Sequence, residues 1–203
     1  MNQQFWWFLS RASGIVAWAL LCASIVWGVL LSTRLMRPHD RPAWLLDLHK
    51  WFAALAVFGV AIHMGALVAD TYVDFGWRDL SIPMASEWKP GPVTWGVLAT
   101  YLLVAVQLTS LLMRKLPRRI WHLIHLTSYL MFAMTSAHAF TSGTDASNDL
   151  FQIFAAIVIT LVSTLTVVRV FYAVRSHDPD ARSARPPVSS TNDSRPVQRS
   201  TAP

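Results

Sequence analysis

The sequence has a single cysteine and few charged residues. Cys22 is the only cysteine among 203 residues, which excludes an internal disulfide bond. Lysine, arginine, aspartate and glutamate together make up 14% of the chain, whereas apolar residues make up 54%, outside the usual range of soluble domains. The strand-like alternation of a membrane β-barrel is also missing. These absences favour a helical membrane protein.

Long stretches without a charged residue are abundant. Five of them contain at least 18 residues, close to the roughly 20 that cross a ~30 Å hydrocarbon core as a helix. In lipid, a helix pairs all its backbone polar groups within one segment. We therefore predict an all-α integral membrane protein, a bundle of five transmembrane helices. The predicted spans are 14–32, 51–68, 93–113, 120–140 and 150–168.

Positive charges are distributed unevenly between the connections. Lysine and arginine near the ends of membrane helices favour the cytoplasmic side, whereas acidic residues have little influence. The cations gather after the first span, between the third and fourth, and after the fifth, so we expect the N-terminus outside and the C-terminus in the cytoplasm. They include Arg34, Arg37, Arg41, Arg114, Lys115, Arg118, Arg119, Arg169 and Arg175.

The end of the chain has a different composition. Residues 175–203 are rich in serine, arginine and proline and contain no aromatic residue, which leaves too little apolar surface for folding. We predict a membrane domain over 1–174 and a disordered, basic cytoplasmic tail over 175–203. Its arginines are expected to orient the bundle and contact anionic lipid, and no nucleic-acid partner is expected.

Two of the predicted spans each contain a pair of widely spaced histidines. His49 and His63 lie fourteen residues apart on the second span, and His125 and His138 lie thirteen apart on the fourth. A rise of 1.5 Å per residue separates each pair by about 20 Å along its helix. Because both spans run outward from the cytoplasm, we expect His49 and His125 near the inner face and His63 and His138 near the outer face.

Two levels with one histidine from each helix suit a flat cofactor whose metal is bound on both faces. Haem fits, because its iron takes axial histidines. The directions of the side chains around each helix agree less well. A spacing of fourteen residues brings His63 to within about 40° of the helix face of His49, whereas a spacing of thirteen leaves His138 about 140° from the face of His125. Either the fourth span bends or overwinds near Ser128, Thr135 or Ser136, or the two ring planes meet it from different sides.

Two further side chains, His122 and Arg11, are candidates for contacts with a metal or a haem at these levels. His122 lies one turn before His125 and could pair with it around zinc or replace it as a ligand. The span has no acidic or thiol side chain, so we interpret His122 as an interfacial residue near Arg118. Arg11 has two interpretations: its side chain extends to the membrane interface, or it pairs with a haem propionate at the outer level.

Several segments resemble a known family, the ferric reductase-like transmembrane domain. They are the histidine pairs, "RASGIVAW", "DLHKW" and "LPRRIWHLIHLTSY". The resemblance extends over 5–174 and implies a cytochrome b of the bacterial plasma membrane. It implies two b-type haems that carry single electrons across the membrane, with His49 and His125 as the inner ligands and His63 and His138 as the outer ligands.

The resemblance also bears on partners. Ferric reductases and NADPH oxidases continue into a flavin and nicotinamide domain, whereas here a short polar tail follows the last span. A separate flavoprotein, quinol or periplasmic redox partner is therefore expected, with this chain as the haem-bearing membrane component of an oxidoreductase. Two alternatives stay open: a membrane anchor subunit with structural histidines, and a metal-ion carrier, which the near absence of carboxylates in the spans disfavours.

Overall fold

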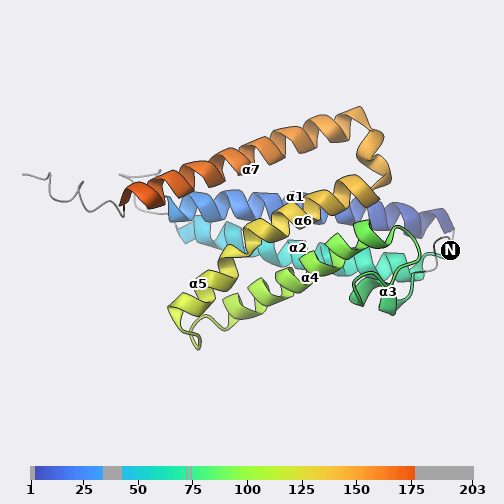
Figure 1. The fold of residues 1–203 in the computed structure, drawn as a ribbon, viewed down its shortest axis with the longest axis horizontal. Helices are drawn as coiled ribbons and strands as arrows, with labels where there is room; N and C mark the ends of the chain where they lie inside the picture. Colours follow the sequence, from blue (N-terminus) through green and yellow to red (C-terminus); the bar gives the residue numbers. More distant parts are fainter. Residues whose placement is uncertain (1–2, 34–42, 72, 74, 177–203) are drawn as a thin grey trace, which may run out of the picture.

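The computed structural model describes residues 3–33, 43–71, 73 and 75–176. The described residues form helices and no strand. The helices are α1 (Gln3–Ser32), α2 (Ala43–Ala69), α3 (Trp77–Ser81), α4 (Pro90–Leu111), α5 (Arg118–Leu126), α6 (Ser128–Ser142), the 3₁₀ helix η2 (Thr144–Ser147) and α7 (Asp149–Ser176). Figure 1 shows the longer helices running roughly along one axis, with α3 at one end and α5 at the other.

Four helices of the described residues are long and apolar enough to cross a membrane. They are Gln4–Ser32, Ala43–Ala69, Pro90–Leu111 and Asp149–Phe171, and they contain most of the first, second, third and fifth predicted spans. The fourth predicted span, 120–140, lies in two shorter helices, α5 and α6. The prediction of an all-α membrane protein is thus confirmed, while the count of five spans and their orientation stay predictions.

The fourth predicted span breaks at Thr127. The backbone N–H of Thr127 donates to the carbonyl of Ile124 at 3.0 Å, a 3₁₀-type bond, and its hydroxyl donates to the same carbonyl at 2.6 Å. Helix α6 begins at the next residue, Ser128, which was one of the three positions predicted for a bend. His125 and His138 therefore lie on two separate helix axes, and the rotational mismatch of a straight helix does not apply.

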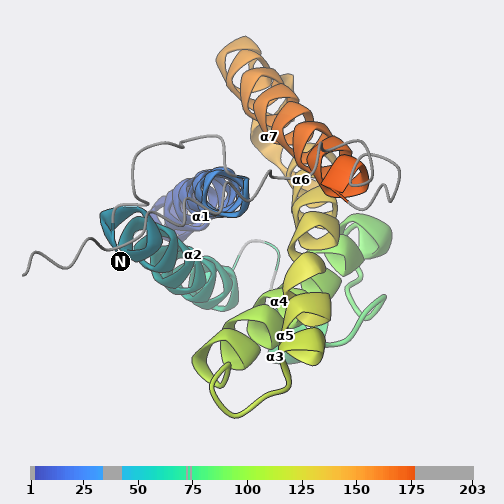
Figure 2. The same cartoon turned by 90° about the vertical axis from the view of Figure 1, so that its left-hand side faces the viewer.

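Helix α1 is the most buried of the four helices that could cross a membrane. Its buried side chains Trp18, Cys22, Ile25 and Val29 recur every three or four residues, the spacing of one helix face. The helix packs along α2 and also against α6 and α7, while α4 packs along α6 (Figure 2). The indole Nε1 of Trp18 donates to the Ser136 hydroxyl at 3.1 Å, so α1 and α6 are also joined by a buried hydrogen bond.

The outward surfaces of α2 and α7 are apolar. In a soluble protein so much exposed apolar surface would cause association, whereas in a bilayer it contacts lipid. The large exposed apolar side chains include Trp44, Trp51, Leu55 and Phe58 on α2, and Leu150, Ile153, Ile157, Leu161, Val167, Val170, Phe171 and Val174 on α7.

The connection between α2 and α4 covers one end of the bundle. Phe75 and Leu80 of this connection are buried against Val93 and Val97 of α4. Pro90 lies in the first turn of α4, where its missing N–H costs no hydrogen bond. This packing keeps the connection over the end of the bundle near α3.

Helix α7 begins with a side-chain cap and is longer than predicted. The Asn148 carboxamide oxygen accepts from the backbone N–H of Leu150 at 3.0 Å and of Phe151 at 3.2 Å, satisfying N–H groups that lack helical partners. The helix continues to Ser176, so the predicted domain boundary at 174 falls in its last turn. The rest of the predicted tail, 177–203, lies outside the described residues.

Candidate functional site

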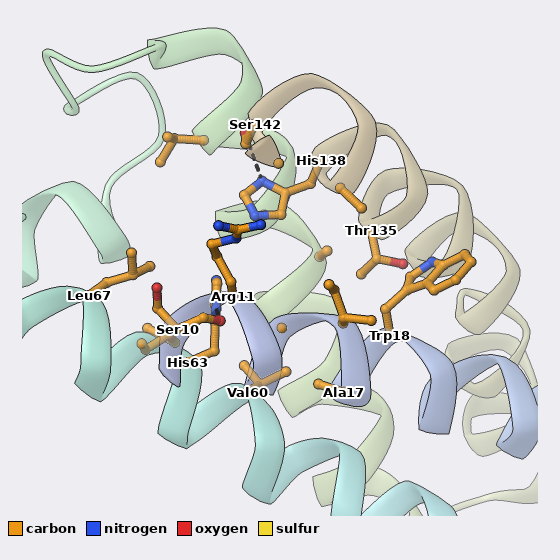
Figure 3. Close-up of a pocket in the computed structure, with 18 of the residues that line it drawn as sticks. Ser10, Arg11, Ala17, Trp18, Val60, His63, Leu67, Thr135, His138 and Ser142 are labelled. Atoms are coloured by element: carbon orange, nitrogen blue, oxygen red, sulfur yellow. Dashed lines mark hydrogen bonds between the residues drawn. The ribbon is translucent and has the colours of Figure 1, made fainter. Parts of the chain in front are cut away.

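Two histidines face each other at the end of the bundle near α3. His63 comes from α2 and His138 from α6, and their ring centres are 6.4 Å apart with an angle of 83° between the ring planes. Both rings line one cavity, with an empty volume of about 1520 Å³ that includes space open to the surroundings (Figure 3). We call these two residues the outer pair, after the predicted orientation.

A second pair lies toward the other end. His49 of α2 and His125 of α5 have ring centres 6.0 Å apart, with an angle of 63° between the ring planes. The indole of Trp121 stacks on His125 at 5.1 Å between ring centres. His122 is exposed, and it is His125 that faces His49. We call His49 and His125 the inner pair; the four histidines singled out from the sequence thus meet two by two.

Hydrogen bonds orient both rings of the outer pair. The Nδ1 of His63 lies 2.7 Å from the carbonyl oxygen of Ser10, and the Nδ1 of His138 lies 2.9 Å from that of Pro92. The Ser142 hydroxyl is a further 3.3 Å contact of His138. A carbonyl only accepts, so each Nδ1 must carry the proton, which leaves the Nε2 lone pair free to bind a metal.

Hydrogen bonds orient one ring of the inner pair more firmly than the other. The Nδ1 of His49 lies 2.9 Å from the carbonyl oxygen of Ser24 and 3.1 Å from its hydroxyl. The Nδ1 of His125 has one polar neighbour, the Ser110 hydroxyl at 3.5 Å, which is at the limit of a hydrogen bond. Protonated Nδ1 atoms held by a neighbouring carbonyl or hydroxyl are typical of metal-binding histidines.

Three glycines make room for the imidazoles. A Cβ atom at any of them would meet the neighbouring ring at or inside normal van der Waals distance, so an alanine would force the ring to move. The glycines and their rings are Gly14 of α1 with His63 (3.0 Å), Gly28 of α1 with His49 (3.3 Å) and Gly96 of α4 with His138 (2.8 Å).

These glycines follow a pattern that sequence reasoning missed. Each lies four residues after the residue whose carbonyl accepts from the histidine, so carbonyl and gap are neighbours on one helix face. In α1 the pattern is "SRASG" and then "SIVWG", with Gly14 and Gly28 fourteen residues apart like His49 and His63. On α4, Ser110, whose hydroxyl lies near His125, comes fourteen residues after Gly96, which faces His138. The repeated spacing in the first span was the signal that could have revealed them.

An ion pair also lines the outer cavity. The Arg11 Nε donates to Asp145 Oδ2 at 3.0 Å, and its Nη2 contacts the other carboxylate oxygen. Arg11 belongs to α1 and Asp145 to η2, and both line the cavity with the outer pair. Figure 3 shows Arg11 beside the two rings. The two sequence-based interpretations of Arg11, a contact with the membrane interface or with a haem propionate, stay predictions; in the structure its side chain pairs with Asp145.

The separation of the imidazoles provides a test of fit for haem. A metal–imidazole bond of about 2 Å, with about 1 Å from the bonded nitrogen to the ring centre, places two axial rings roughly 6 Å apart. The observed separations are 6.0 and 6.4 Å. Among the described residues no group of three or more His, Cys, Asp or Glu could hold a metal ion. The ring separation at each level is compatible with two axial imidazoles on the iron of a haem.

A helical membrane bundle with two levels of facing, oriented imidazoles defines a class of membrane protein suited to metal-centred redox chemistry. Residues 13–136 match the model of the family described as ferric reductase like transmembrane component. The chain belongs to this family, as its sequence predicted, and membership supports a transmembrane electron-transfer role; domains of this family generally bind haem. No curated protein and no solved structure matches the chain.

The extent of the match bears on the two pairs differently. The matched residues include His49, His63 and His125 and end shortly before His138. Arg11 and Asp145 also lie outside them. The inner pair thus falls entirely within the family match, whereas His138 of the outer pair lies two residues beyond its end.

Proposed function

We propose that the chain is a di-haem cytochrome b that passes single electrons between the two faces of the membrane. One haem b is held by His49 and His125 and the other by His63 and His138. The observation that carries this proposal is the facing arrangement of the imidazoles, with ring centres 6.0 and 6.4 Å apart. Angles of 63° and 83° between the ring planes are compatible with it, because each ring can rotate about its own metal–nitrogen bond.

The chain's own residues bind and orient, and the iron supplies the one-electron chemistry when bound. The carbonyls of Ser10, Ser24 and Pro92 fix the protonated Nδ1 atoms of three histidines. Hydrogen bonding of this kind raises ligand basicity and prevents the ring from turning away. Apolar side chains such as Trp18 and Leu103 line the outer cavity, which suits the largely apolar ring of a haem.

Transfer across the membrane requires the two levels to lie at different depths. On α2 the two histidines are fourteen residues apart, about 20 Å along the helix. Electrons enter at one level and leave at the other, so a donor and an acceptor are needed on opposite faces. A separate flavoprotein, a quinol or a periplasmic redox protein is the proposed partner, with the N-terminus outside and the C-terminus in the cytoplasm.

The test is quantification of haem in the purified protein. We expect a reducible b-type absorbance equivalent to two haems per chain, and alanine at any one of the four histidines should reduce this to about one. His122→Ala is the matched control, because His122 is exposed and His125 is the residue that faces His49. A folded but colourless protein would contradict the proposal and favour a membrane anchor with structural histidines.

A further inference from the structure

The two histidine pairs differ in the charged groups near them. The described residues contain two ion pairs. Arg11 and Asp145 line the outer cavity, whereas Lys50 and Asp47 are largely exposed and their charged atoms are 3.7 Å apart. The side chains of Arg11 and Asp145 keep only 32% and 22% of their surface exposed. Charges that are partly buried beside an apolar cavity are screened less by water and salt than charges on the surface.

The position of this ion pair connects it to both outer histidines. Arg11 lies between Ser10, whose carbonyl holds His63, and Gly14, which faces the same ring. Asp145 lies in η2, which follows the α6 helix that carries His138. In Figure 3 the Arg11 side chain extends from α1 toward His138. The pair therefore joins the segments that hold the two outer imidazoles.

Arg169 of α7, which lies close enough to His125 of the inner pair to interact with it electrostatically, has a different partner. The Arg169 Nη1 of α7 donates to the Tyr129 hydroxyl at 2.7 Å, and its guanidinium lies over the same ring at 5.8 Å. A tyrosine hydroxyl is neutral near pH 7. Arg11 is thus compensated by a carboxylate, whereas the described partner of Arg169 leaves its charge uncompensated.

We propose that Asp145 is a positioning residue that lowers the reduction potential of the haem at the outer pair by neutralising Arg11. This inference rests on the proposed function. One electron enters the site on reduction, and no bond is made or broken. The added negative charge is stabilised by a nearby cation and destabilised by a nearby anion, so Asp145 and Arg11 act in opposite directions.

The experiment is a redox titration of the haem-loaded protein followed by absorbance. The outer component is identified as the one that disappears in His63→Ala. Asp145→Asn should raise its reduction equilibrium constant about tenfold, which is 59 mV for one electron, and Arg11→Gln should lower it by a similar factor. The double variant, which lacks both charges, should lie near the unchanged protein, and Asp145→Glu should keep the original value.

Asp47→Asn is the matched control, because it removes a carboxylate from the exposed ion pair. It should leave the outer component unchanged. Asp145→Asn with both haems bound and an unshifted outer component would overturn the proposal. So would loss of the outer haem in both Asp145→Asn and Arg11→Gln, which would make the ion pair a structural tie alone. A wild-type protein without haem would instead contradict the proposed function.

Discussion

Gly96 of α4 lies directly against the imidazole of His138. A Cβ atom on this glycine would be 2.8 Å from both the Cε1 and the Nδ1 of the ring, a distance that real Cβ atoms do not tolerate. The carbonyl of Pro92, one turn earlier on the same helix, accepts from the same Nδ1 at 2.9 Å. The ring is therefore confined between a hydrogen-bond acceptor and a gap that only glycine leaves open.

Gly96→Ala should displace His138 and remove the outer haem. The added methyl would force the ring away from the Pro92 carbonyl, and a ligand misplaced by even 1 Å is seriously impaired. We expect the haem content to fall from about two to about one per chain.

Gly65→Ala is the control for this prediction. A Cβ at Gly65 meets nothing within 4 Å, although this residue is only two positions from His63 on α2. The same chemical change should leave both haems in place, and it should favour the helix slightly. Equal haem content in Gly96→Ala and Gly65→Ala would contradict the role given to the glycine.

Gly14 and Gly28 predict a graded series. A Cβ would lie 3.0 Å from His63 at Gly14 and 3.3 Å from His49 at Gly28. Gly14→Ala should therefore weaken retention of the outer haem more strongly than Gly28→Ala weakens retention of the inner haem. Haem retained after repeated washing in detergent is the measurement, and the reverse order would show that the contacts do not govern retention.

Trp121 should act on the inner haem alone. Its indole stacks on His125 at 5.1 Å with an angle of 25° between the planes, and such contacts contribute about 1 kcal/mol beyond buried area. Trp121→Ala should weaken retention of the inner haem about fivefold, while Trp121→Phe should keep most of it. Absorbance of the two components resolved by redox titration separates the effects, and a loss confined to the outer component would contradict this prediction.

The hydrogen bond between Trp18 and Ser136 should contribute to stability. It is buried and joins α1 to α6 at 3.1 Å, and interhelical hydrogen bonds in membranes contribute about 0.6 kcal/mol, at most about 1.7. Ser136→Ala should lower the free energy of unfolding in mixed micelles by an amount in this range. Ser32→Ala is the control, since its hydroxyl donates to Val29 within the same helix; equal losses in both variants would remove the special role of Ser136.

The positions of the long helices could be predicted because they depend on local composition. Uncharged apolar stretches are the property that a bilayer requires, so most of each predicted span lies in an observed helix. The break at Thr127 was harder to locate, because neither proline nor glycine occurs between 118 and 142. The thirteen-residue spacing predicted that the helix is irregular, and only the hydrogen bonds of Thr127 locate the break.

The candidate site could be predicted only in part. The histidines stand out because imidazoles are rare and costly in an apolar span. Their anchors are backbone carbonyls, which every residue possesses, so Ser10 and Pro92 carry no signal of their own. The partner of Arg11 depends on where η2 lies relative to α1, a tertiary relationship between segments far apart in the chain.

The pairing of the histidines is the central claim, and double variants test it most directly. His63→Ala combined with His138→Ala removes two ligands of one proposed site, so about one haem per chain should remain. His63→Ala combined with His125→Ala removes one ligand from each site, so both haems should be lost. Haem counted in these two purified variants decides the matter: loss of both haems in the first, or one haem retained in the second, would contradict the account.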